Sequence, residues 1–321
     1  MAATRGQPTE VAYAAAIESS DKITAAEPRS TAGPLKKAYA ALMTMAISGS
    51  GTSSAERVQK CLAEAAVVLE REPENPYASD VAAACNAFAA DGAQGRGEDP
   101  EPLFRRAIAL LEPAVERTPH FLWGLNDMAG TYLAYASFLQ LHGSSSTKTY
   151  LEKAVSYEKK AMALDESYLI AIQNALFTIS RMVMLAQSSA ESGGLLTQAD
   201  DLFERCKRKN GQYQQCHINY LSVYARAAQR AAVTGQAVDG LLKRAKETLV
   251  EARKLGGSFL DLEQHAALIH LLDVGALVRD HRDPTQVRGE LQNTLRKCLA
   301  INGQDAMCRT IEAQARWVSA E

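Results

Sequence analysis

The six cysteines of this 321-residue chain fall into three pairs, and each pair is centred on a predicted turn. The pairs are Cys61 with Cys85, Cys206 with Cys216, and Cys298 with Cys308. The first pair lies twelve residues either side of Pro73, and the others lie five residues either side of Gly211 and Gly303. Five residues turn an α-helix by about 500° and twelve by about 1200°, which differ by only about 20° after whole turns. We therefore expect all three pairs in the same seam between antiparallel helices.

Two interpretations of this spacing stay open. In the first, the pairs are three disulfides that join neighbouring helices, and the protein matured in an oxidising, extracytoplasmic compartment. In the second, free cysteines fill the seam as small buried hydrophobic residues, and a cytoplasmic location follows. Helix axes pack ~8–10 Å apart, whereas a disulfide needs Cα atoms within ~7 Å, so bonding requires a close crossing lined by small residues.

Motifs for other chemistry are missing from the sequence. The six histidines include no pair spaced four residues apart, and no HExxH, CxxC or EF-hand pattern occurs. The segment "GAQGRG" lacks the lysine of a phosphate-binding loop, and there is no GxSxG motif. We therefore expect no catalytic residues, no metal site and no cofactor, which argues against an enzyme.

Composition predicts an all-α protein. Aromatic residues make up 6% of the chain, while helix formers such as Ala, Leu, Glu and Lys fill long stretches between Pro and Gly clusters. A formal net charge of −2 argues against a dedicated nucleic-acid binder. No stretch approaches the ~18 apolar residues of a transmembrane helix, and the N-terminus lacks a secretory signal pattern.

Turn signals recur with a period of about 46 residues. Successive turns are separated by 45, 46, 47, 45, 46 and 46 residues, and they are centred on Pro28, Pro73, Pro119, Glu166, Gly211, Gly257 and Gly303. A second, looser set of breakers lies midway, and Asp99 and Thr285 there have the sequence context of helix N-caps. We expect one α-solenoid over residues 1–321 with about 14 helices. It comprises a leading helix (1–27), six antiparallel hairpins (28–302) and a closing helix (303–321).

Small residues recur where the two helices of a hairpin must approach closely. The residues five positions before the last five turns are alanine or cysteine, and so are those twelve positions before each turn, except Leu291. With these positions the chain resembles the tetratricopeptide (TPR) repeat, whose pattern matches Ala107, Ala114, Pro119 and Tyr132. The usual TPR unit has ~34 residues. The longer period here is nearer to HEAT-type repeats, which stay open as an alternative fold.

The first helix of each hairpin is expected to line a groove, where equivalent residues form stripes. Eight and fifteen residues after the turns, adjacent hairpins place Asn174 with Arg181 and Asn219 with Arg226. By resemblance, these positions correspond to the asparagines and basic residues with which some TPR domains hold a partner's carboxylate. We expect this set to bind an acidic or C-terminal segment of a protein partner. The alternative is that the two asparagines only tie neighbouring helices together.

Further groove candidates come from the earlier hairpins. Asp127 belongs to the same stripe as the two asparagines. Phe88 and Trp123 are expected either to anchor a partner side chain or to belong to the core.

Residues from about 57 to 321 also resemble the helical-repeat tails that follow the kinase domain in serine/threonine kinases of myxobacterial type. The resemblance is carried by "GRGEDPEPL", "GQYQQCHINYLSVYARAAQ" and "CLAINGQDAMCRTIEAQARW". It implies a regulatory, partner-recruiting region, and the chain itself carries no kinase motif. The alternative is a TPR accessory component of a periplasmic solute transporter, for which an oligomer is conceivable.

Overall fold

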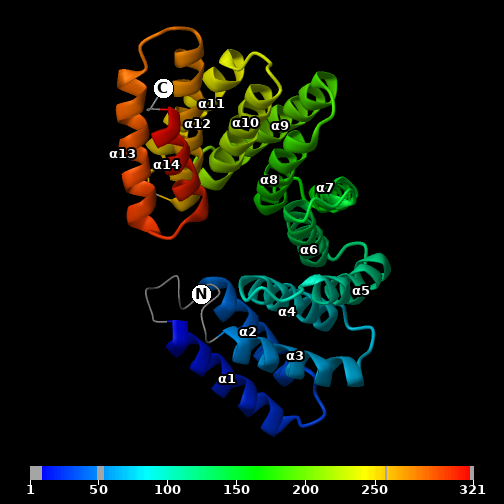
Figure 1. The fold of residues 1–321 in the computed structure, drawn as a ribbon. Helices are drawn as coiled ribbons and strands as arrows, with labels where there is room; N and C mark the ends of the chain where they lie inside the picture. Colours follow the sequence, from blue (N-terminus) through cyan, green and yellow to red (C-terminus); the bar gives the residue numbers. More distant parts are fainter. Residues whose placement is uncertain (1–8, 49–53, 257–258, 319–321) are drawn as a thin grey trace. The chain divides into compact units, whose positions relative to one another are not determined.

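The computed structural model describes residues 9–48, 54–256 and 259–318, and within these ranges every regular element is an α-helix (Figure 1). Two compact units divide the chain, unit 1 (Met1–Glu166) and unit 2 (Ser167–Glu321). Unit 1 holds α1 (Thr9–Ala26), α2 (Ala32–Ser48), α3 (Ser54–Arg71), α4 (Pro76–Gly95), α5 (Glu101–Arg117), α6 (Leu122–Leu141) and α7 (Thr147–Leu164). Unit 2 holds α8 (Leu169–Leu185), α9 (Ser189–Asn210), α10 (Gln214–Val233), α11 (Asp239–Lys254), α12 (Leu260–Arg279), α13 (Thr285–Ile301) and α14 (Ala306–Val318).

This element order confirms the prediction of an all-α chain built from helical hairpins. The described helices are fourteen in number, from α1 to α14, and the division into a leading helix, six hairpins and a closing helix stays a prediction. The prediction that residues 1–321 make one continuous solenoid stays a prediction. Of the helices described, none has the length and apolar character needed to cross a bilayer.

The tight connections at Pro73, Pro119, Gly211 and Gly303 share one four-residue turn. In these four, the N–H of the fourth residue donates to the carbonyl of the first at 2.9–3.1 Å, in the pairs Asn75–Glu72, Phe121–Thr118, Tyr213–Asn210 and Asp305–Asn302. Because the same turn is used each time, the helix that follows leaves in the same direction relative to the helix before. The sequence period thereby becomes a structural period within each unit.

The loose connections after α4, α6, α10 and α12 also share one motif, a left-handed helix end. In these four, an N–H donates to the carbonyl five residues earlier at 2.8–3.0 Å, in the pairs Glu98–Ala93, Ser144–Leu139, Gln236–Ala231 and Arg282–Leu277. This is the Schellman arrangement, whose left-handed position favours glycine. Gly97, Gly143 and Gly235 occupy it with φ of 76°, 66° and 69°, whereas the fourth connection places His281 there with φ of 56°.

The two helix starts expected at proline differ in detail. Pro100 occupies the N-cap position of α5, and Oδ1 of Asp99 before it accepts the N–H of Glu101 at 3.0 Å. The expectation for Thr285 was wrong, since Thr285 is the first residue of α13 and Asp283 does the capping. The Asp283 carboxylate accepts both the N–H and the hydroxyl of Thr285, at 3.0 and 2.6 Å. A carboxylate is the stronger acceptor and carries the charge that the helix dipole favours.

The hairpin seam is lined by small, fully buried side chains. Alanines at the two predicted positions, such as Ala107, Ala154, Ala199 and Ala245, are 0% exposed. The cysteines occupy the same seam, and the structure pairs their sulfurs as the disulfides Cys61–Cys85, Cys206–Cys216 and Cys298–Cys308. Their Cα atoms lie 6.4, 6.6 and 6.4 Å apart, which is the close approach that disulfide bonding requires.

Buried tyrosines join three successive helices in each unit. In unit 1, Tyr132 on α6 donates to Glu112 on α5 at 2.6 Å and accepts from Lys153 on α7 at 3.2 Å. The same order of acid, tyrosine and base recurs in unit 2 as Asp200, Tyr220 and Arg244. Each tyrosine hydroxyl therefore links the outer helices on both sides of its own inner helix.

The left-handed residue at the end of α12 gives a prediction about stability. Replacing His281 with glycine removes a β-carbon from a left-handed backbone position, and we expect the free energy of unfolding to rise by about 0.5–1 kcal/mol. The melting temperature, measured by circular dichroism, should rise by about 1–2 °C. Gly143→Ala, at the equivalent position of an earlier connection, serves as the control and should lower it. A fall for His281→Gly would contradict the assignment of strain.

The cysteine pairs give a second prediction. Protein unfolded without reductant should react with no equivalent of iodoacetamide, and the same protein after reduction should react with six. Because each bond closes a loop of 10 or 24 residues, reduction should also lower the stability by roughly 2–4 kcal/mol per bond. Alkylation of six thiols before reduction would show that the cysteines are free.

Candidate partner-binding site

Three basic side chains gather on the inner helices of unit 2. Arg181 lies on α8, Arg226 on α10 and His265 on α12, and α10 packs against both other helices. Burial lowers the pKa of both arginines, and the charge of Arg181 lowers that of Arg226 further. Burial, followed by the charges of the two arginines, also lowers the pKa of His265 to about 4, although Nδ1 lies 2.6 Å from the Asp261 carbonyl oxygen. His265 is therefore neutral near pH 7, while the guanidinium groups keep their charge.

Neutral side chains contact both arginines. The guanidinium of Arg181 lies over the ring of Phe177, 5.4 Å from its centroid. Nη1 of Arg226 donates to Oε1 of Gln229 at 3.1 Å. A hydrogen bond to an amide oxygen does not neutralise the positive charge of Arg226, so this charge still attracts anions. We call Arg181, Arg226 and His265 the basic cluster.

The predicted asparagines behave differently from the arginines. Nδ2 of Asn219 donates to the carbonyl of Gln173 at 2.7 Å, and its Oδ1 accepts from Gln215 at 3.0 Å. Asn219 thus ties α10 to α8, which is the alternative that the sequence left open. Asn174 accepts from the neighbouring Gln173 side chain at 3.4 Å. The structure therefore favours the arginines, rather than Asn219, as the groups that meet a partner.

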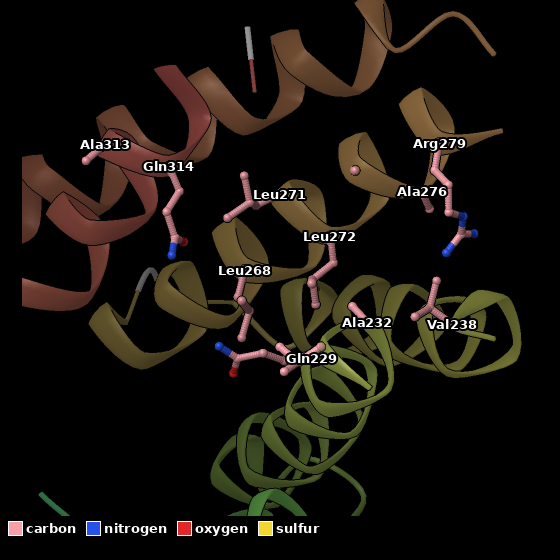
Figure 2. A pocket seen from close by; sticks show the side chains of 12 residues that line it. Gln229, Ala232, Val238, Leu268, Leu271, Leu272, Ala276, Arg279, Ala313 and Gln314 are labelled. Atoms are coloured by element: carbon pink, nitrogen blue, oxygen red, sulfur yellow. The ribbon is translucent and has the colours of Figure 1, made fainter. Parts of the chain in front are cut away.

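An apolar pocket of about 680 Å³ lies beside the basic cluster, between α10, α12 and α14. Figure 2 shows Leu268 and Leu272 of α12 directed toward Gln229 and Ala232 of α10, while Gln314 extends from α14 toward α12. Gln229 belongs to both features, because it lines the pocket and accepts the hydrogen bond of Arg226. The pocket and the basic cluster are therefore continuous along α10.

The remaining predicted residues, Asp127, Phe88 and Trp123, belong to unit 1. Phe88 is half-buried and packs against the core cluster of α2, α3 and α4, so its role is structural. Trp123 is 58% exposed on α6, which leaves its ring available to a partner. Asp127 lies one helical turn further along α6, where Asn126 donates to its Oδ1 at 3.1 Å.

Asp127 is part of a buried carboxyl cluster that the sequence analysis missed. Asp80 on α4 and Glu158 on α7 are 2% and 1% exposed, and within the described part of the chain Oδ1 of Asp80 and Oε2 of Glu158 have no hydrogen-bond partner. Tyr39 donates to the other oxygen of Asp80 at 3.1 Å. Burial and then the charge of Asp127 raise the pKa of Asp80 and raise that of Glu158 to about 9. Burial likewise raises the pKa of Asp127.

Among the described residues, one group of potential metal ligands lies close together, namely Cys298, Asp305 and Cys308. Its two sulfurs are bonded to each other in the third disulfide, which leaves a single carboxylate. This group therefore has no thiolate to offer a metal ion.

Sequence signals existed for some of the missed residues. Asp80 is one of only two acids in the alanine-rich helix α4, which indicates a buried carboxyl group, but it lies one position before the residue of the stripe, Val81. The pocket has a fainter signal. The position eighteen residues after each turn is held, in successive inner helices of unit 2, by Met184, Gln229 and Gly275. The helix that lines the pocket therefore has no side chain at this position.

Comparison with known proteins yields likenesses of structure alone. No protein-family model matches the chain, and no curated protein matches its sequence. Among solved structures, TTC0263, a thermophilic TPR protein of Thermus thermophilus, is 17% identical, with a TM-score of 0.48 over 72% of this chain and 97% of that one. A monomeric mutant of IFIT1 with Gppp-AAAA is 13% identical, with a TM-score of 0.51 over 93% of this chain.

The match to IFIT1 supports the fold and nothing beyond it. It spans 57% of the length of the IFIT1 chain, and 13% identity carries no information on ligands or partners. The hairpins, the small-residue seam and this likeness together show a TPR-like helical-repeat fold.

The buried carboxyl cluster of unit 1 gives a prediction about pH. Because the pKa of Glu158 rises from 4.5 to about 9 on folding, the native state keeps a proton that the unfolded chain has lost between these values. The free energy of unfolding should therefore fall as the pH rises from about 5 to 9. Glu158→Gln stays neutral, so at pH 8 it should be more stable by about 1 kcal/mol or more and should depend less on pH.

Glu152→Gln, on the exposed face of the same helix, is the matched control and should change neither quantity. Thermal unfolding by circular dichroism at pH 5, 7 and 8.5 measures both variants. A Glu158→Gln protein that is less stable than the wild type at pH 8 would show that this carboxyl group is charged and paired in the native state.

Proposed function

We propose that this chain is a non-catalytic, protein-binding scaffold in which the basic cluster of unit 2 holds a carboxylate of a partner segment. The observation that carries the proposal is the pair Arg181 and Arg226, two desolvated guanidinium groups on adjacent inner helices whose charges act on each other. The TPR-like fold supports the same kind of function, since helical repeats present extended surfaces to partners.

The physical reasoning starts from the cost of burying like charges. A guanidinium group has a pKa too high to lose its proton, so both charges persist in a site that water reaches poorly. A carboxylate placed between them reduces their mutual repulsion and accepts paired hydrogen bonds from the planar forks. The neutral His265 beside them provides a further ring nitrogen for hydrogen bonding without adding a charge.

A protein partner fits this site better than a nucleic acid. The cluster supplies two charged arginines, and the chain has a net charge of −2, whereas affinity for nucleic acids depends on many cations along a phosphate backbone. The IFIT1 structure contains Gppp-AAAA, and that ligand is a useful comparison rather than an expectation for this chain. An acidic or C-terminal peptide segment is the proposed ligand.

The biological setting that we propose is signalling. The resemblance of residues 57–321 to the repeat tails of myxobacterial-type kinases supports a region that recruits a partner for such an enzyme. The three disulfides support an extracytoplasmic location for it. A TPR accessory component of a periplasmic solute transporter shares the disulfides, and assembly into a ring would favour that alternative.

Paired substitutions test the proposed carboxylate site. Fluorescein-labelled decapeptides that carry two glutamates and a free C-terminus should bind the wild-type chain, as measured by fluorescence anisotropy. Arg181→Ala with Arg226→Ala should weaken binding at least tenfold, because a bound carboxylate loses both of its charged partners. The control Arg208→Ala with Arg282→Ala removes the same charge from exposed positions of unit 2 and should change affinity less than twofold.

Several outcomes would contradict the proposal. Equal weakening by both double variants would show that net charge, and not the basic cluster, attracts the peptides. Tighter binding of a labelled RNA pentanucleotide than of any acidic peptide would favour a nucleic-acid ligand instead.

A further inference from the structure

We infer that the apolar pocket between α10, α12 and α14 is a second subsite of the same partner site, and that it takes a leucine- or phenylalanine-sized side chain next to the partner's acidic residue. This inference rests on the proposed function of the basic cluster. It adds the class of partner segment, which is an acidic residue beside a large apolar one.

The pocket has the size and the lining of a binding site. Its volume of about 680 Å³ lies within the range of pockets that hold small organic groups. Leu268, Leu271 and Leu272 supply its apolar wall (Figure 2). Val233 lines it too and is 81% exposed, so an apolar group that enters would also cover this side chain.

A missing side chain contributes to the hollow. A β-carbon built on Gly275 would meet no atom within 4 Å, and Gly275 lines the pocket. The equivalent residues of the two preceding inner helices are Gln229 and Met184, which carry long side chains. Glycine in the middle of α12 weakens the helix relative to these residues. The chain therefore keeps an opening here at the expense of helix stability.

The charges around the pocket define what fits it. Gln229 lines the pocket and accepts a hydrogen bond from Arg226 at 3.1 Å, which places the basic cluster at its edge. Arg226 and Gln229 are three residues apart on α10, so roughly 5 Å of helix separates the charged subsite from the apolar one. Adjacent residues of a peptide span about 3.3–3.8 Å, so one acidic and one apolar side chain, one or two positions apart, reach both subsites.

The rim completes the match to a polypeptide. Gln229 and Gln314 bring amide groups to the pocket from α10 and α14 (Figure 2). Amide side chains both donate and accept, which suits the N–H and C=O groups of a peptide backbone. Arg279, a further lining residue, forms a hydrogen bond to Asp280 through Nε at 2.9 Å. An acidic amphipathic peptide bound here thus contacts the apolar wall, the two amide side chains and the guanidinium of Arg279.

The test uses the full chain and peptides that differ at one position. Fluorescein-labelled octapeptides of Ser and Gly carry a central Glu-Xaa-Glu, in which Xaa is Leu, Phe or Ser. The wild-type chain should bind the Leu and Phe peptides about tenfold more tightly than the Ser peptide, as measured by anisotropy. Gly275→Met places in the pocket the residue found at the equivalent position 184, and it should reduce this advantage to less than twofold.

The design separates the two subsites. Gly275→Met should leave the affinity for the Ser peptide unchanged, whereas Arg181→Ala with Arg226→Ala should weaken all three peptides by a similar factor. Gly289→Met is the matched control, because Gly289 is also helical, also has no atom within 4 Å of a built β-carbon and lies outside the pocket. Methionine has the higher helix propensity, so neither glycine variant should unfold.

Each result has a distinct meaning. Equal wild-type affinity for the Leu, Phe and Ser peptides would overturn the apolar subsite while leaving the carboxylate site intact. An advantage for Leu and Phe that survives Gly275→Met would place the apolar contact elsewhere and would also overturn the inference. Failure of the wild-type chain to bind any of the acidic peptides would remove the proposed function itself, and the subsite with it.

Discussion

The close approach of paired helices at the tight turns is the constraint on which the rest of the structure depends. Cα separations of 6.4–6.6 Å at the cysteine pairs leave room for nothing larger than a small side chain between the backbones. The equivalent positions of other hairpins carry alanines that are 0–1% exposed, such as Ala107 and Ala114. A larger side chain in place of one of these alanines would overpack the seam. The seam therefore sets the helix spacing, and the spacing sets which side chains meet between one hairpin and the next.

Fixed spacing makes contacts recur at the period of the sequence. Asn219 donates to the carbonyl of Gln173, 46 residues earlier, and Arg230 donates to that of Ala186, 44 residues earlier. In unit 1, Tyr39 and Asp80 meet over 41 residues. Such bonds tie each inner helix to the one before it. Side chains at equivalent positions are then brought close together even when they carry the same charge. The charges of Arg181 and Arg226 act on each other for this reason.

The sequence alone predicts those features that depend on one hairpin and its period. The turn spacing, the buried small residues and the cysteine pairs follow from counting residues, because a turn and two helices determine them. The alignment of Arg181 with Arg226 follows from the same count. The location of the pocket does not, since it depends on three helices and on the absence of a side chain at Gly275. The left-handed conformation of His281 could not be predicted from the sequence either, because the usual sequence signal for this conformation is a glycine.

The carboxyl cluster escaped prediction because proton binding depends on burial, which residue counting does not measure. Asp80 lies beside the apolar Val81 in an alanine-rich helix, and Glu158 comes from an outer helix, where an acid is usually solvated. Both groups are desolvated because the helices packed around them bury their side chains. Their raised pKa values are thus a product of the tertiary structure.

The carboxyl cluster of unit 1 and the basic cluster of unit 2 differ in sign, and the two kinds of group respond differently to burial. Carboxyl groups such as Glu158 respond to burial by keeping a proton, so the cluster of unit 1 can neutralise itself near neutral pH. Guanidinium groups have no such response, because even a lowered pKa leaves Arg181 and Arg226 protonated. In the proposed function, the carboxylate of a partner segment reduces their repulsion. A common helical framework therefore produces an acidic cluster that can hold protons in one unit and the proposed binding site in the other.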